Sequence, residues 1–290
     1  MAPTLPFRRV AVLGTGLIGG SFALALREDF PEISIVGYNR GGRAERARAR
    51  GAIHEVAADI PGAVRGADLV YIALPVGAAI EALPAIAELA EPGALVTDAC
   101  STKAALCRAA KEHFRGGAFF LGGHPMAGKE NSGIDNADAA LFRGAPYALI
   151  AQENDPDERV SNFAAVVRAI GAQPVWLDAD THDWAVGIVS HLPQLVSVAL
   201  ARVVLDETDE TGLPISLAGH GLHSMLRLSG SPYNIWRDIF LTNKDNVSRA
   251  LDRLAQAVDH LRTRLASKDL EQEFQAANEI YKLLEKPRSE

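Results

Sequence analysis

The sequence predicts an α/β protein, in which an N-terminal Rossmann domain with a doubly wound parallel sheet precedes an all-α C-terminal domain. Three observations predict this fold class. Short apolar runs alternate with helix-period segments through the first half of the chain. A glycine fingerprint joins the first apolar run to the first helical segment. Beyond about residue 178, helical periodicity dominates and no strand alternation is convincing.

The expected strands are short, rich in β-branched or large apolar residues, and bounded by Gly, Pro or Asp. In chain order they are Val10–Leu13, Ile33–Gly37, Leu69–Leu74, Ala94–Thr97 and Phe119–Leu121. Helical segments such as Gly20–Arg27 and Ala78–Leu89 lie between them, so the strands should run parallel in one sheet. We expect two later apolar runs, Tyr147–Ile150 and Pro174–Leu177, to extend that sheet.

The second half of the chain is expected to be helical over Thr181–Leu205 and Trp236–Leu284. From residue 248 onward, apolar residues recur at three- and four-residue spacing with charges between them, as in an amphipathic helix or helix pair. We therefore predict a Rossmann domain at residues 1–178 and a helical substrate and dimerisation domain at residues 179–290. The apolar surface of the second domain favours a homodimer.

Composition limits the classes of function. The chain of 290 residues is 48% apolar and 22% charged, as in ordinary soluble globular proteins. Its net charge of −7 argues against nucleic acid as a partner, because phosphate binding normally requires a basic surface. We see neither a signal peptide nor a run of about 18 apolar residues, so no membrane partner is expected. Cys100 and Cys107 are too few for a disulfide framework, which favours the reducing cytoplasm.

The fingerprint is Gly14-x-Gly16-x-x-Gly19, preceded by a strand and followed by a helix and a second strand. Gly14 permits the tight turn, Gly16 lets the backbone approach a pyrophosphate, and Gly19 lets helix and strand pack closely. The N-terminus of the helix offers free N–H groups to the phosphates. The other expected cofactor contacts are Leu17, Ile18 and Pro75.

The position that reads the ribose lies about 20 residues beyond the fingerprint, where the chain has Asn39-Arg40. Asn39 lacks the carboxylate that would repel a 2′-phosphate, and Arg40 could pair with one, together with Arg43. This favours NADP slightly. Alternatively, Asn39 binds the ribose hydroxyl of NAD and Arg40 stacks near the adenine, so the cofactor is NAD or NADP.

Three polar stretches are hard to explain by packing alone. They are TDACSTK at residues 97–103, GGHPMAG at residues 122–128 and SHLP at residues 190–193. The first two directly follow expected strands, where an open α/β sheet places its ligand crevice. A single histidine is commonly a satisfied polar core residue. Two histidines beside small residues or proline at such a crevice indicate chemistry.

In these motifs the chain resembles the prephenate and arogenate dehydrogenases of tyrosine biosynthesis. The resemblance runs in order from GTGLIGGS through DACSTK, GGHPMAGKENSG, SHLP and WRDI, and covers nearly the whole chain. It implies oxidative decarboxylation of a cyclohexadienol: hydride leaves the ring carbon that bears the hydroxyl, and CO2 leaves the opposite carbon. Prephenate would give 4-hydroxyphenylpyruvate and arogenate would give tyrosine. No metal is implied.

The resemblance also implies roles for single residues. His124 would bind the ring hydroxyl and take its proton, a task that suits a neutral imidazole. Ser101 would orient His124 or the hydroxyl. Arg227 would hold a substrate carboxylate, which a planar guanidinium can bind with two hydrogen bonds. The remaining expected substrate contacts are Ser190, His191, Gln194 and Trp236, with Glu130 near the entrance.

Two positions depart from the family pattern. Gln194 stands where the family often has a second histidine, and Ser224 where it often has an aspartate. The missing carboxylate removes one partner for the ammonium of arogenate, which tilts the prediction weakly toward prephenate. A β-hydroxyacid dehydrogenase is disfavoured, because the helix SHLPQLVSVALARVV offers no catalytic lysine. A dinucleotide-binding sensor without turnover is a more distant alternative.

Overall fold

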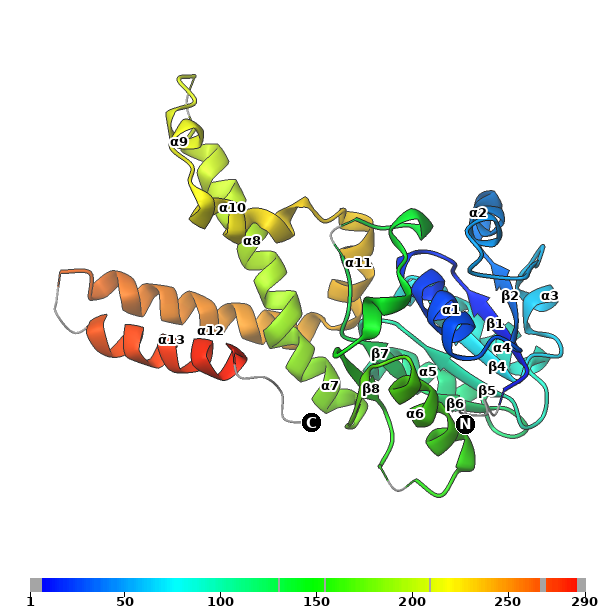
Figure 1. The fold of residues 1–290 in the computed structure, drawn as a ribbon. Helices are drawn as coiled ribbons and strands as arrows, with labels where there is room; N and C mark the ends of the chain where they lie inside the picture. The colour runs from blue at the N-terminus through cyan, green and yellow to red at the C-terminus, as the bar shows by residue number, and fades with distance from the viewer. Residues whose placement is uncertain (1–6, 130, 154, 209, 267–269, 286–290) are drawn as a thin grey trace.

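The structure is a computed structural model that describes residues 7–129, 131–153, 155–208, 210–266 and 270–285 (Figure 1). A compact α/β domain, coloured blue to green, carries an elongated helical part, coloured yellow to red. The predicted fold class, a Rossmann domain followed by helices, is confirmed.

Within the described residues, a six-stranded parallel sheet has the order β3-β2-β1-β4-β5-β6. The order reverses between β1 and β4, and the ligand crevice of such a sheet opens at that point. All five strands predicted for this sheet are present. The sixth strand, β3, was not predicted, because it is only two residues long and contains no apolar run. The strands are β1 (Arg9–Leu13), β2 (Ser34–Tyr38), β3 (Glu55–Val56), β4 (Leu69–Ile72), β5 (Leu95–Asp98) and β6 (Phe119–Leu121).

Both faces of the sheet are buried. Along β1, Val10 and Val12 belong to one hydrophobic core, and Ala11 and Leu13 belong to the other. This alternation explains why the strands are apolar at every position rather than at every second one. The helices of this domain are α1 (Leu17–Asp29), α2 (Arg43–Ala49), α3 (Ile60–Val64), α4 (Val76–Leu89), α5 (Ala104–His113) and α6 (Glu158–Ala169).

The prediction that Tyr147–Ile150 and Pro174–Leu177 extend the main sheet is wrong. They lie in β8 (Pro146–Leu149) and β9 (Gln173–Trp176), which form a separate sheet with β7 (Gly123–Pro125) among the described residues. The chain leaves the main sheet just before Gly123, where a Cβ would lie 2.7 Å from the carbonyl oxygen of Asp98. This close crossing carries β7 over the end of β5, and β7 pairs antiparallel with β8.

The helical part begins with one continuous helix of 28 residues, Ala179–Asp206. Its path contains a wide turn at Gly187–His191, with hydrogen bonds of the π type. Pro193 explains the turn, because it has no N–H to donate to the carbonyl of Val189 and its ring would clash there. The elements are α7 (Ala179–Val186), η4 (Gly187–His191), α8 (Leu192–Asp206), α9 (Leu213–Ser216), α10 (His220–Leu226), η5 (Arg227–Gly230), α11 (Tyr233–Thr242), α12 (Lys244–Thr263) and α13 (Leu270–Glu285). The division into residues 1–178 and 179–290 stays a prediction.

Two carboxylates of the helical part dock it onto the Rossmann domain. Asp183 of α7 accepts hydrogen bonds from the backbone N–H groups of Lys103 (2.7 Å) and Ala104 (2.9 Å), at the start of α5. Asp238 of α11 accepts one from the N–H of Gly77 (3.3 Å), in the first turn of α4. The first turn of a helix has N–H groups without internal partners and the positive end of the helix dipole, so both contacts stabilise the junction.

Large apolar side chains remain exposed along the helical part, for example Val198 and Leu205 of α8 and Leu284 of α13. The helix Ala179–Asp206 is the one described helix that is long and apolar enough to cross a membrane, judged by length and composition alone. Its first turns, however, are fixed to α5 through buried Asp183. The exposed apolar faces are therefore better explained as a surface on which another protein chain packs.

Candidate active site

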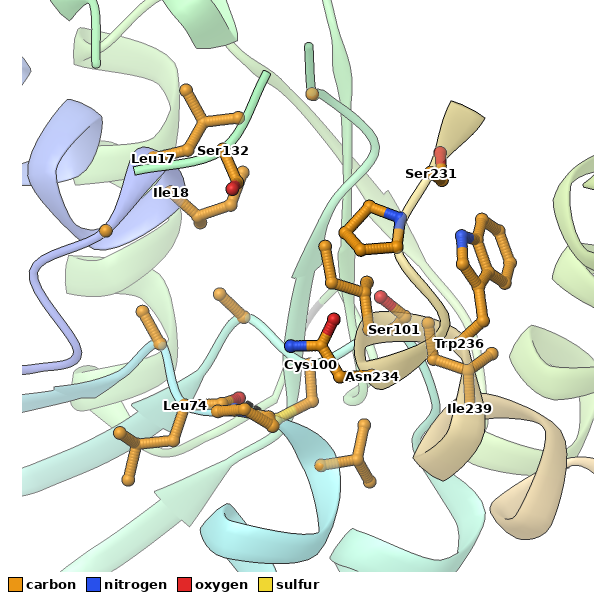
Figure 2. A pocket seen from close by; sticks show the side chains of 18 of the residues that line it. Leu17, Ile18, Leu74, Cys100, Ser101, Ser132, Ser231, Asn234, Trp236 and Ile239 are labelled. Carbon is orange, nitrogen blue, oxygen red and sulfur yellow. Dashed lines mark hydrogen bonds between the residues drawn. The ribbon is translucent and has the colours of Figure 1, made fainter. Parts of the chain in front are cut away.

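A cavity of about 380 Å³ lies between the two parts of the chain, at the carboxyl edge of the main sheet (Figure 2). Leu17 and Ile18, at the start of α1, form one side of it, and Trp236 of α11 forms the other. Ser101 lies between them, just after β5. The cavity thus lies at the switch point of the sheet and is closed by the helical part.

The glycine fingerprint has the shape that a dinucleotide requires. Gly14 has a φ of +96°, and a Cβ there would lie 2.3 Å from the carbonyl oxygen of Ala73. A Cβ at Gly19 would lie 2.0 Å from the carbonyl oxygen of Gly14, so α1 and β1 approach as closely as the fold allows. At Gly16 a Cβ would meet nothing within 4 Å, because this glycine faces the cavity. The open space at Gly16 and the free N–H groups of α1 fit a pyrophosphate.

A second cavity, of about 590 Å³, continues from the first. The two share Leu74 and Pro75, which follow β4. The second cavity reaches Asn39 and Arg40 at the end of β2, the expected site of the adenosine ribose. The crevice therefore runs from Trp236 to Arg40, with Gly16 in the lining of the first cavity, as an extended dinucleotide needs.

A buried ion pair fixes the strand that carries His124. The carboxylate of Asp98 accepts a hydrogen bond from the N–H of Gly123 (3.0 Å), and the ammonium of Lys103 donates one to the carbonyl of Gly123 (2.7 Å). Lys103 and Asp98 also form a salt bridge with each other, and both side chains are fully buried. Because the pair holds both polar groups of Gly123, it sets the position of the next residue, His124.

His124 heads a chain of hydrogen bonds that reaches into the helical part. Its Nδ1 lies 2.9 Å from Nε2 of His182, and Nδ1 of His182 lies 2.8 Å from Oδ1 of Asp183. That carboxylate already accepts two backbone N–H groups, so it acts here as an acceptor and His182 donates through Nδ1. Because Nδ1 of His182 donates to Asp183, its Nε2 accepts, and Nδ1 of His124 donates. The lone pair on Nε2 of His124 is left for another proton.

Burial lowers the pKa of His124 well below its usual range, and the nearby His182 and Lys103 lower it further. A buried imidazole without a carboxylate of its own is costly to charge. His124 is therefore neutral at physiological pH, which is the protonation state that a general base needs.

On the helical side, His191 and Gln194 are buried, and each has one polar atom without a hydrogen-bond partner among the described residues. Nδ2 of Asn243 donates to the carbonyl of Asp183 (2.7 Å) and to Nδ1 of His191 (3.1 Å). His191 must then carry its proton on Nε2, which has no hydrogen-bond partner among the described residues. Gln194 donates through Nε2 to the carbonyl of Leu228 (2.9 Å), and its Oε1 likewise has no partner in the described chain.

These unpaired atoms are a donor and an acceptor, placed three residues apart on one helix. A buried polar atom without a partner costs about 1–3 kcal/mol, so it commonly marks a ligand or an ordered water. Burial also lowers the pKa of His191 to about 4, which keeps this donor neutral at physiological pH.

The predicted site residues lie at different places relative to the cavity. The cavity is lined by Gly16, Leu17, Ile18, Pro75, Ser101 and Trp236. His124 is outside that lining and only 8% exposed, and the ring of Trp236 packs edge-on against His191 at 6.1 Å. Ser190 is half-buried on the same turn, and Arg227 is exposed beside Leu228, the partner of Gln194. Glu130 lies outside the described residues.

Four residues that support His124 were not predicted from the sequence, namely Asp98, Lys103, His182 and Asp183. Two signals could have indicated them. Asp98 and Lys103 lie within the DACSTK motif, and the adjacent pair His182-Asp183 directly follows the predicted domain boundary. Neither signal reveals that these side chains meet His124.

Comparison with known proteins gives the family. The nucleotide-binding domain of prephenate dehydrogenase matches residues 22–176, and the prephenate dehydrogenase dimerization domain matches residues 178–279. The chain belongs to the prephenate dehydrogenase family. The prephenate dehydrogenase of Lactococcus lactis is 30% identical to it over 96% of this chain and 78% of that protein.

Solved structures of this family are similar over nearly the full length. A prephenate dehydrogenase from A. aeolicus, in complex with hydroxyphenyl propionate and NAD+, has a TM-score of 0.88 at 26% identity, covering 98% of this chain and 100% of that one. Synechocystis arogenate dehydrogenase has a TM-score of 0.79 at 28% identity, covering 95% of this chain and 99% of that one.

The chain is accordingly an NAD(P)-dependent dehydrogenase, as the fingerprint predicted. The family also explains the exposed apolar faces of the helical part, because the region that contains them is a dimerization domain. The predicted homodimer acting on a small molecule fits both findings.

Two alanine substitutions separate the structural glycine from the ligand-facing one. Gly19→Ala should lower the free energy of unfolding by about 3 kcal/mol, because the new methyl overlaps a backbone oxygen. Gly16→Ala should leave stability within about 0.5 kcal/mol but weaken NAD(P) binding about tenfold, because its methyl fills the space for the pyrophosphate. Urea unfolding and calorimetric titration measure the two effects. Equal loss of stability in both variants would contradict this division.

His191 should make stability depend on pH. Its pKa of about 4 in the folded chain lies below the value of about 6.5 for an unfolded one, so the unfolded chain binds the extra proton between these values. The free energy of unfolding should therefore decline as the pH falls from about 6.5 towards 4. Since asparagine does not titrate, His191→Asn should flatten this decline by up to about 1.4 kcal/mol per pH unit. Urea unfolding at several pH values measures it, and identical slopes would contradict the assignment.

Proposed function

We propose that this chain is a prephenate dehydrogenase, which converts prephenate to 4-hydroxyphenylpyruvate with reduction of NAD(P). The observation that carries the proposal is the neutral His124, whose Nε2 is kept as a proton acceptor by His182 and Asp183. A base of this kind beside a dinucleotide crevice suits the removal of hydride from a carbon that bears a hydroxyl. The cytoplasm is the proposed location.

The bound cofactor supplies the acceptor for the hydride. As the hydride leaves, Nε2 of His124 takes the proton of the ring hydroxyl, and the carbon–oxygen bond gains double-bond character. The positive charge that develops on His124 is shared through Nδ1–H with His182 and faces the carboxylate of Asp183. The bond to the ring carboxyl group then breaks, CO2 leaves, and the electron pair makes the ring aromatic, while the ring oxygen takes its proton back from Nε2 of His124. Ser101, which lines the cavity, is proposed to hold the hydroxyl oxygen toward His124.

The carboxylates of the substrate need donors on the helical side. We assign Arg227 and the Nε2–H of His191 to this task, with Ser190 beside them and Trp236 closing the pocket. Glu130 is proposed to lie near the entrance. Because His191 is neutral, it contributes a hydrogen bond without adding a buried charge to the pocket.

Arogenate is the second candidate substrate, and Gln194 is the observation that favours it. The carbonyl of Leu228 can only accept, so the amide of Gln194 must point Nε2 toward it and leave Oε1 as a bare acceptor. The ammonium of arogenate could donate to that oxygen, whereas the keto group of prephenate could not. A bound water could satisfy Oε1 when prephenate is the substrate.

The assay of function pairs prephenate or arogenate with NAD or NADP and follows the absorbance of the reduced nicotinamide. Turnover of prephenate is expected, and His124→Asn should reduce kcat about 100- to 10,000-fold because the proton acceptor is lost. Cofactor affinity should stay unchanged in that variant. Absence of turnover in all four pairs, by protein that binds cofactor, would overturn the proposal. Near-normal turnover by the variant would refute the role of His124.

Replacing the amide tests the second candidate. Gln194→Met keeps the length of the side chain but removes the acceptor, so kcat/KM for arogenate should fall about tenfold if its ammonium binds there. The value for prephenate should change little. Gln173→Met, on the exposed face of β9, is the matched control. An equal loss with both substrates would show that Gln194 serves packing only.

A further inference from the structure

The end of β2 carries a cavity whose chemistry the dehydrogenase reaction itself does not explain. This cavity, of about 450 Å³, is lined by Asn39, Arg40 and Arg48. Asn39 and Arg40 also line the larger cavity that leads to Pro75, together with Arg43. These side chains therefore surround the place where the adenosine ribose of a dinucleotide would lie.

The guanidinium groups at this cavity are uncommitted. Arg40, Arg43 and Arg48 are exposed, and none of them has an ion-pair partner among the described residues. Arg46, on the same helix as Arg43, is different because it forms a salt bridge with Asp135. Three such cations around two neighbouring cavities, on a chain of net charge −7, produce a local positive field.

Two carboxylates share the site but do not cancel this charge. Glu45 lines the smaller cavity and Glu81 the larger one. Neither forms a salt bridge with Arg40 in the described chain. The surroundings thus hold three cations against two anions, and Arg40 alone belongs to both cavities among the three arginines.

The backbone and the residue before Arg40 also favour an anion. Asn39 donates through Nδ2 to the hydroxyl of Thr15 at 3.4 Å, so a neutral amide occupies the position where a carboxylate would repel phosphate. Gly41 and Gly42 both have positive φ, +69° and +71°, and a Cβ at Gly41 would meet nothing within 4 Å. The loop therefore leaves open space directly beside Arg40.

We propose that Arg40, supported by Arg43, binds the 2′-phosphate of NADP, and that the chain prefers NADP to NAD. The phosphate carries almost two negative charges at neutral pH and accepts two parallel hydrogen bonds from a guanidinium. This inference rests on the proposed function, which supplies the identity of the reaction. Its test measures nucleotide binding and requires no turnover.

The test is calorimetric binding of adenosine 2′,5′-bisphosphate and of AMP to the full chain. The wild type should bind the bisphosphate at least about tenfold more tightly, and Arg40→Ala should remove most of that difference while leaving AMP binding unchanged. Arg108→Ala, an exposed arginine on α5, is the matched control and should change neither affinity. Equal affinities of the wild type for both nucleotides would overturn the proposal.

A second variant tests the same preference by adding a negative charge instead of removing a positive one. Asn39→Asp places a carboxylate at the ribose, so it should weaken the bisphosphate about tenfold and spare AMP. If both variants weaken AMP as much as the bisphosphate, the residues support the loop and the proposal fails. The proposed function fails separately, by absence of turnover with either cyclohexadienol.

Discussion

The carboxylate of Asp183 is the contact on which the rest of the site depends. It accepts two N–H groups at the start of α5 and the Nδ1–H of His182, so one side chain joins the domains and fixes the direction of a hydrogen-bond chain. Without it, His182 could donate through either nitrogen, and His124 would have no fixed tautomer. The same interaction therefore joins the two parts of the chain and orients the proton acceptor.

The buried pair of Lys103 and Asp98 also fixes the position of His124, through contacts within the Rossmann domain. A charged pair in the interior stabilises little by itself, because both ions lose their hydration. Here each ion also binds the backbone of Gly123, which fixes β7 and hence the imidazole of His124. The Rossmann domain thus fixes the backbone next to His124, and the helical part fixes the ring of His124.

The features of the fold that the sequence predicts are those that depend on residues close together in the chain. The apolar runs of β1, β2, β4, β5 and β6 and the turn at Gly14 follow from neighbouring residues, and the structure contains them. The pairing of β8 was not predictable, since it depends on how Gly123 crosses Asp98. The contact between His124 and His182 joins residues 58 positions apart, and no spacing rule reaches that far. Motif resemblance located the proposed base but not the side chains that determine its protonation.

The tautomer of His124 can be measured by two-bond ¹⁵N–¹H correlation NMR at neutral pH, with the signals assigned by comparison with His124→Asn. We expect a protonated Nδ1 and a bare Nε2, because Asp183 orients His182 and His182 accepts from His124. In Asp183→Asn, the preference for a proton on Nδ1 of His124 over one on Nε2 should be weaker. A proton on Nε2 of His124 in the wild type would refute its role as the base, since the nitrogen assigned to receive the substrate proton would already carry one.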